Sequence, residues 1–279
     1  MRKIKVVSLL FTVLLISFFT LLISRVPIFA QTQTPGFDFS KAYQDYIYNY
    51  NLYRDSHISY ESAKGEYRNY QTLSAQTKAL EATRDMLRKR DEVLRTYFTA
   101  LRMKLVESTG VTNYDQSVSF LRLDTEVNWL AVHKDSLSSP STLEDLVKSS
   151  QAVEGKNINF ELLSYQSLGL ILSGKENALR EKINSQTDKI DTELEIMKKD
   201  GENVDKLQWW LIEAKKKINL SKDKQAAAET KINSLKDASY INNRQATYNK
   251  AQLLYEESNQ YLKEGLNFLS EITDSIKYE

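Results

Sequence analysis

The sequence contains no cysteine and only three prolines, eight glycines and two histidines in 279 residues. Without cysteine the chain can form no disulfide, has no thiol for lipid attachment and has no thiol-based active site. Because glycine and proline are the main turn-forming residues, their scarcity favours a few long elements over many short ones. The sequence therefore predicts long helices whose stability comes from packing.

Groups that carry enzymatic chemistry are also scarce. His57 and His133 have no second histidine or cysteine at ligand spacing, which argues against a metal site. No G-x-S-x-G motif presents a nucleophile. Acidic residues such as Asp188 and Glu195 lie on helix faces that we expect to be solvated, where few pockets would shift a carboxyl pKa. We expect a non-enzymatic protein that needs no cofactor and no metal.

One short segment matches a nucleotide-binding pattern. Residues 169–175, GLILSGK, satisfy G-x-x-x-x-G-K, in which backbone amides and a lysine hold phosphates. The next residue is Glu176, where a phosphate-binding loop has the serine or threonine that binds magnesium, and no clear strand precedes the segment. We interpret the match as a coincidence.

The first thirty residues resemble a targeting segment. Arg2, Lys3 and Lys5 precede an uncharged run of 19 residues, Val6 to Ser24, which as a helix would be about 28 Å long. That length suits a membrane anchor, whereas Ala30 offers a small residue at a signal-peptide cleavage point. Residues 1–30 are therefore either a signal peptide or a signal anchor, followed by a linker over 31–37. In both cases the basic N-terminus predicts that the rest of the chain is extracytoplasmic, either secreted or anchored at the cell surface.

The charge of the remaining chain is close to neutral. Loss of residues 1–30 would remove four of the 38 basic residues and no acidic ones, leaving 34 against 37. This balance gives no argument for a nucleic-acid partner. We expect attachment to a membrane only through residues 6–24, if they are not cleaved off.

Apolar and aromatic residues repeat at the alternating four and three spacing of a helix seam. The seam begins at Phe39, passes through the tyrosines of residues 43–67 and continues as leucines at seven-residue intervals from Leu73 to Leu101. It predicts one long helix over about 38–106. Gly110, just beyond it, is suited to the left-handed conformation that ends helices.

The remaining segments also show helical spacing. We expect a second helix over 113–137, a break at Ser138-Ser139-Pro140, and a third helix over 141–199. Gly201 would end that helix. A last helix is expected over 203–277, with a change of heptad phase near Tyr240.

The arrangement expected from these lengths is an all-α, elongated antiparallel bundle or coiled coil of three long arms, whose middle arm is broken near Pro140. In helix length and heptad spacing alone, the pattern resembles spectrin-like and other extended helical bundles. No residue motif identifies a family.

Exposed aromatic residues are the best candidates for partner contacts. Most tyrosines of residues 43–67 lie on the helix seam and should pack, but Tyr48 lies off it. Trp209 and Trp210 follow the turn at Gly201, and we expect one ring to cover the bundle core and the other to be partly exposed. Trp129 is expected to pack in the core.

The sequence thus favours a coiled-coil rod that acts as a scaffold, spacer or tether at the cell envelope, through a protein partner or self-association. The alternative is an envelope binding module that recognises a glycan or peptide through the tyrosine-rich first helix and Trp209 and Trp210.

Overall fold

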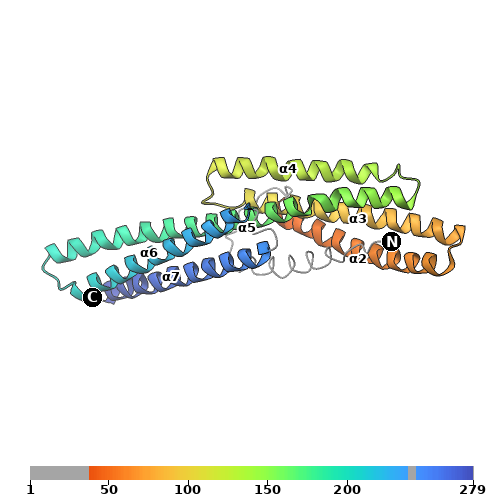
Figure 1. Cartoon of the computed structure of the whole chain (residues 1–279). Helices are drawn as coiled ribbons and strands as arrows, with labels where there is room; N and C mark the ends of the chain where they lie inside the picture. Colours follow the sequence, from red (N-terminus) through yellow and green to blue (C-terminus); the bar gives the residue numbers. More distant parts are fainter. Residues whose placement is uncertain (1–37, 238–242, 279) are drawn as a thin grey trace. The chain divides into compact units, whose positions relative to one another are not determined.

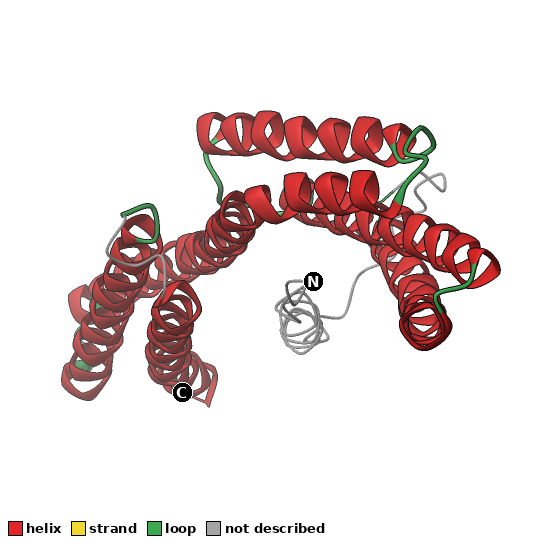
Figure 2. Cartoon of the chain, turned by 45° about the vertical axis from the view of Figure 1, so that its right-hand side comes forward, coloured by secondary structure: helices red, strands yellow, loops and turns green. Residues whose placement is uncertain are grey.

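All regular elements in the described part of the chain are α-helices (Figures 1 and 2). A computed structural model describes residues 38–237 and 243–278; the predicted segments 1–30 and 31–37, with Ala30, lie outside these ranges. The helices are α2 (Phe39–Tyr70), α3 (Leu73–Val106), α4 (Asn113–Ser136), α5 (Leu143–Lys199), α6 (Asp205–Ser234) and α7 (Arg244–Tyr278). The predicted all-α bundle is confirmed. Among these helices none is both long and apolar enough to span a membrane.

The chain reverses direction between α2 and α3, so the single helix predicted over 38–106 is wrong. Gln71 ends α2 in the left-handed region at φ 48°, and the Thr72 side chain then caps α3. α2 and α3 form an antiparallel pair in which Tyr46 contacts Tyr97 at a ring distance of 5.7 Å. The prediction failed because heptad spacing also fits a helical hairpin, in which both helices turn the same seam inward.

A second reversal separates α6 from α7, which corrects the continuous helix predicted over 203–277. The cap of α6 is Leu235, and α7 begins at Arg244. The buried guanidinium of Arg244 donates to the carbonyl oxygens of Leu235 at 3.0 Å and of Ile158 in α5 at 3.1 Å. It therefore satisfies a carbonyl at the end of α6 and fixes the start of α7. The change of heptad phase expected near Tyr240 lies outside the described residues.

The middle of the chain has the expected break near Pro140. Leu137 caps α4, and Thr142 caps α5 by accepting a hydrogen bond from the amide of Asp145 at 3.2 Å. From there α5 runs without interruption for 57 residues. Gly201 follows it in the left-handed region at φ 91°, as the sequence predicted.

The long helix α5 takes part in two groups of packed helices. Its first part packs with α3 and α4, while α2 packs on α3, and its second part packs with α6 and α7 (Figure 1). The first group has a core that includes Leu87, Phe98, Leu101, Leu105, Leu123, Leu130, Leu146 and Phe160. The second has a core that includes Ile183, Leu194, Leu207, Leu211, Ala214, Ile218, Leu262, Leu269 and Ile272.

Tyrosine rings make much of the contact between α2 and α3. Tyr46, Tyr50, Tyr53 and Tyr60 are buried, which confirms that the seam tyrosines pack. The rings of Tyr46 and Tyr50 are tilted against each other at 6.3 Å, an arrangement that aromatic side chains favour.

Two glycines inside α5 allow neighbouring segments to approach its backbone. A Cβ atom on Gly169 would lie 2.9 Å from Ile232 of α6, and one on Gly174 would lie 2.4 Å from Val111 in the connection between α3 and α4. Gly169 and Gly174 are the glycines of the G-x-x-x-x-G-K match, which lies within a continuous helix. The glycines therefore serve helix packing and do not form a phosphate-binding loop.

Candidate functional site

The aromatic residues predicted as partner contacts lie on two different groups of helices. Tyr48, on α2, is 64% exposed, and Trp209, on α6, is 56% exposed. Trp210 is half-buried against the core of α5, α6 and α7, with the ammonium of Lys206 4.4 Å from its ring centroid. The tryptophans divide as predicted, into one exposed and one packed ring. Tyr48 does not share their helix group, so the three residues do not form one recognition surface.

Trp209 is held in a defined orientation at the surface. Its ring meets the edge of the Phe268 ring at a centroid distance of 6.2 Å and an angle of 89°. Ile212, three residues further along α6, is also largely exposed. This patch is small, but it contains an exposed tryptophan of the kind that contributes strongly to interfaces.

A longer apolar surface lies on α4, and sequence analysis did not single it out. Its exposed members are Tyr114 (77%), Val118 (40%), Leu121 (70%) and Val132 (70%). Thr125 and Asn128, which are also exposed, lie between Leu121 and Val132. With them, the residues are four, three, four, three and four positions apart, so their side chains lie in one line along the helix. We call these six residues the α4 stripe. The signal was available in the sequence as a second heptad series on a helix that already had one.

Beside the stripe, α4 is fixed by a buried pair of His133 and Asp91. Nδ1 of His133 lies 2.6 Å from a carboxylate oxygen of Asp91 in α3, and Nε2 lies 3.1 Å from the carbonyl oxygen of Ser149 in α5. Both ring nitrogens of His133 therefore have a polar partner, one in α3 and one in α5. Trp129 stacks on the imidazole at 5.0 Å and is only partly buried, where a core position was expected. These contacts hold α4 to both neighbouring helices.

A second buried polar cluster joins α5, α6 and α7. Glu176 is 2% exposed; one of its carboxyl oxygens accepts from Ser258 Oγ at 2.6 Å and the other from Asn259 Nδ2 at 3.2 Å. Ser258 also lies 2.9 Å from the hydroxyl of Ser221, which accepts a hydrogen bond from Arg180 at 3.0 Å. We call these five residues the Glu176 layer. A carboxyl group, two hydroxyls, an amide and a guanidinium are thus enclosed between three helices.

Burial dominates the electrostatics of this layer. It raises the pKa of Glu176 to about 7, against the opposing effects of the Ser258 hydrogen bond and the Arg180 charge, while Glu229 raises it further. Burial also lowers the pKa of Arg180, whose guanidinium lies 3.8 Å from the Glu176 carboxylate. Glu176 is therefore a buried group whose charge can change near neutral pH.

Further polar side chains adjoin the Glu176 layer between α5 and α6. Gln225 Nε2 lies 2.9 Å from Ser173 Oγ and 2.8 Å from both Asn177 Oδ1 and Glu229 Oε1. Ser173 in turn donates to Glu229. Apart from the Gln225–Glu229 contact within α6, these hydrogen bonds cross between the two helices and add to their registration.

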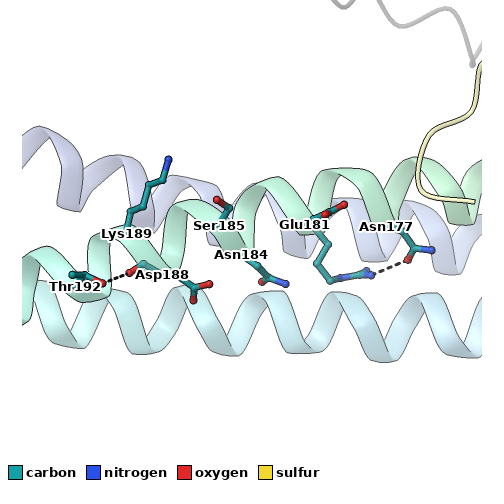
Figure 3. A pocket seen from close by; sticks show the side chains of 8 residues that line it. Asn177, Glu181, Asn184, Ser185, Asp188, Lys189 and Thr192 are labelled. Atoms are coloured by element: carbon teal, nitrogen blue, oxygen red, sulfur yellow. Dashed lines mark hydrogen bonds between the residues drawn. The ribbon is translucent and has the colours of Figure 1, made fainter.

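An open groove lies beside this cluster. Its volume is about 670 Å³, and it is lined by residues of α5 alone: Asn177, Arg180, Glu181, Asn184, Ser185, Asp188, Lys189 and Thr192. Figure 3 shows the labelled side chains spread along this helix, from Asn177 to Thr192. The lining contains amides, hydroxyls and charges of both signs but no aromatic ring, so it lacks the stacking platform of a sugar site. Only Asn177 and Arg180 link it to the buried clusters.

Residues 38–237 and 243–278 contain no candidate metal site. Nowhere in these ranges do three side chains of histidine, cysteine, aspartate or glutamate lie close enough together to hold an ion. His133 is engaged with Asp91, and His57 lies between the rings of Tyr53 and Tyr60 at 6.0 Å from each. Neither histidine has a neighbouring nucleophile among the contacts described.

Comparison with known proteins does not place the chain in a family. No family model, no curated protein and no solved structure matches it.

Proposed function

We propose that the protein is a non-enzymatic helical scaffold that makes protein-protein contacts through the α4 stripe, on the outer side of a cell membrane. The observation that carries this proposal is the exposure of four apolar side chains at heptad spacing on α4, a helix that the His133–Asp91 contact joins to α3. Such a surface fits a partner helix, since alternating four and three spacing is the pattern of knobs-into-holes packing.

The energetic argument rests on the size of these side chains. Burying a leucine or valine against a partner contributes about 1.5–3 kcal/mol. The stripe extends from Tyr114 to Val132, a rise of about 27 Å along the helix. Thr125 and Asn128 interrupt it with polar groups, and a polar residue within a helix seam favours one register over others.

The location is part of the same proposal. It is supported by the basic residues that precede the apolar run 6–24, which favour an outer position for the following chain. A scaffold or tether could act there either as a released protein or attached through that run.

The absence of cysteine makes a site-specific test direct. Leu121→Cys in the full chain provides a single thiol for a photoactivatable cross-linker, and Lys182→Cys, exposed on α5, provides the matched control. We expect one defined cross-linked product, either a dimer of this chain or a complex with one partner, from position 121 alone. Equal cross-linking from both positions, or none from position 121, would contradict a contact at the α4 stripe.

Trp209 supports a second candidate function, recognition of an envelope glycan or peptide. Its ring is exposed and oriented by Phe268, so it could stack on a sugar ring or an apolar side chain. Titration of cell-envelope glycan fragments should then change the tryptophan fluorescence of the full chain and leave that of Trp209→Ala unchanged. If the fluorescence of the unaltered protein does not change, glycan recognition through Trp209 is contradicted.

A further inference from the structure

The carboxyl group and the two hydroxyls of the Glu176 layer have two hydrogen-bond arrangements, one for each protonation state of the carboxyl group, while Nε of Arg180 has no hydrogen-bond partner in the described part of the chain. With Glu176 ionised, Arg180 donates to Ser221 Oγ, Ser221 donates to Ser258 Oγ, and Ser258 donates to the carboxylate. This chain leads from a cation through two hydroxyls to an anion.

With Glu176 protonated, the direction of the chain can reverse. The carboxyl O–H then donates to Ser258 Oγ, and the Ser258 hydroxyl turns to the carbonyl oxygen of Ser221, which lies 2.9 Å away. Ser258 Oγ can still accept from the Ser221 hydroxyl, because a hydroxyl oxygen has two lone pairs. Asn259 donates to the second carboxyl oxygen in either state and uses its other hydrogen on the Tyr255 carbonyl. No donor in the layer loses its partner.

The charge of the layer, by contrast, differs between the two states. The groups that face Glu176 are Arg180 from α5, Glu229 from α6, and Ser258, Asn259 and Tyr255 from α7. Of these, Arg180 and Glu229 act on the Glu176 carboxyl through their charges. Ionisation places an anion in a site that is 2% exposed, with one guanidinium at 3.8 Å. The cost of that burial favours the protonated form.

We propose that the Glu176 layer is a proton-operated latch that holds α6 and α7 to α5 more firmly when Glu176 is protonated and loosens them when it is ionised. In the latching step a proton from solvent adds to the Glu176 carboxylate, and the Ser258 O–H rotates toward Ser221. No covalent bond other than the new O–H bond forms or breaks. This inference is independent of the contact proposed at the α4 stripe.

The pKa of Glu176 is about 7 in the folded chain, against 4.5 for an unperturbed glutamate, so between these pH values the folded carboxyl holds a proton that the opened chain lacks. The resulting stabilisation is lost as the pH rises through about 7. Linkage then predicts that opening of the helices around Glu176 increases about tenfold from pH 6 to pH 8. Hydrogen exchange of the full chain, corrected for the intrinsic pH dependence of amide exchange, measures this opening in peptides that contain Ser221 and Ser258.

Two variants separate a latch from a merely structural role. Glu176→Gln mimics the protonated form and should keep the same protection at pH 6 and pH 8. Glu181→Gln, exposed on the same helix, should retain the tenfold change. Equal pH dependence in the unaltered protein and Glu176→Gln would overturn the proposal.

A measurement on the unaltered chain covers the case in which Glu176→Gln does not fold. The ¹³C chemical shift of the Glu176 carboxyl carbon should titrate with a midpoint near 7. A midpoint below about 5, the range of an ordinary glutamate, would show that the carboxyl stays ionised and would also overturn the latch.

Discussion

The carboxylate of Asp91 in α3 lies 2.6 Å from Nδ1 of His133 in α4, and the two side chains are 0% and 9% exposed. The second ring nitrogen of His133 is used as well, by the Ser149 carbonyl of α5. This pair connects the helix that carries the exposed apolar stripe to the two helices behind it. It therefore links the stability of the first helix group to the orientation of the proposed contact surface.

Removal of one partner of this pair should be costly. Asp91→Ala leaves two buried groups without their acceptor, the His133 imidazole and the Arg90 guanidinium, which lies 3.4 Å from the carboxylate. We expect the free energy of unfolding to fall by about 3–5 kcal/mol in urea denaturation at pH 7. The control is Asp191→Ala, which breaks the half-exposed pair with Lys215 and should cost less than about 1 kcal/mol. Similar losses in the two variants would show that the buried contacts of Asp91 stabilise the fold no more than an exposed ion pair does.

The glycines of the chain predict opposite effects of the same substitution. Nothing lies within 4 Å of a Cβ on Gly65, in an ordinary helical turn of α2, so Gly65→Ala should stabilise the protein by about 0.5–1 kcal/mol. Gly174→Ala should destabilise it by about 1–3 kcal/mol, because the methyl group would meet Val111 at 2.4 Å and the Thr109 carbonyl at 2.9 Å. Thermal unfolding followed by circular dichroism measures both changes, and effects of equal sign would contradict the close packing at Gly174.

The turn between α2 and α3 offers a stabilising substitution. Gln71 has a φ of 48°, a conformation that costs a residue with a side chain about 1 kcal/mol relative to glycine. Gln71→Gly should therefore raise the melting temperature, whereas Gln71→Val should lower it. If Gln71→Gly were destabilising, as it would be in the middle of a continuous helix, the hairpin would be wrong.

Glu92 predicts a loss of stability in acid. Burial alone would raise its pKa, but hydrogen bonds and charges from Arg95 and Lys134 lower it to about 2. Because the folded pKa lies below the unfolded value of 4.5, the stabilisation is complete above pH 4.5 and disappears as the pH falls toward 2. Glu92→Gln should thus be less stable by about 1–3 kcal/mol at pH 7 and nearly equal at pH 2, as determined by urea denaturation across this range. A constant difference at all pH values would contradict the ionic origin.

The sequence predicted helix type and several boundaries well because they depend on local signals. The break near Pro140 and the end of α5 at Gly201 follow from residues that restrict the backbone directly. The reversal at Gln71 has no such signal, since glutamine rarely adopts the left-handed conformation and the seam spacing continues through it. Tertiary packing of tyrosines decides that turn.

The candidate sites show the same division. Exposure of Tyr48 followed from its position off the seam, and the division of Trp209 and Trp210 into one exposed and one packed ring was expected without saying which ring is exposed. The Glu176 layer did not, because Glu176, Ser221 and Ser258 come from three helices whose alignment depends on the reversals. The α4 stripe was not predicted, because a helix that packs through one apolar series can carry a second series on another face, and the spacing alone does not show which series is exposed.

The most direct test of the proposed scaffold role is the size of the full-length protein in solution, measured by sedimentation at several concentrations. The unaltered protein is compared with a double variant that carries Leu121→Asp and Val132→Asp. Both positions are 70% exposed, so the helix content measured by circular dichroism should be unchanged. We predict that the unaltered chain forms a complex, either alone or after addition of the partner identified by cross-linking. The double variant should not form this complex. Equal complex formation by the two proteins would contradict an interface at the α4 stripe.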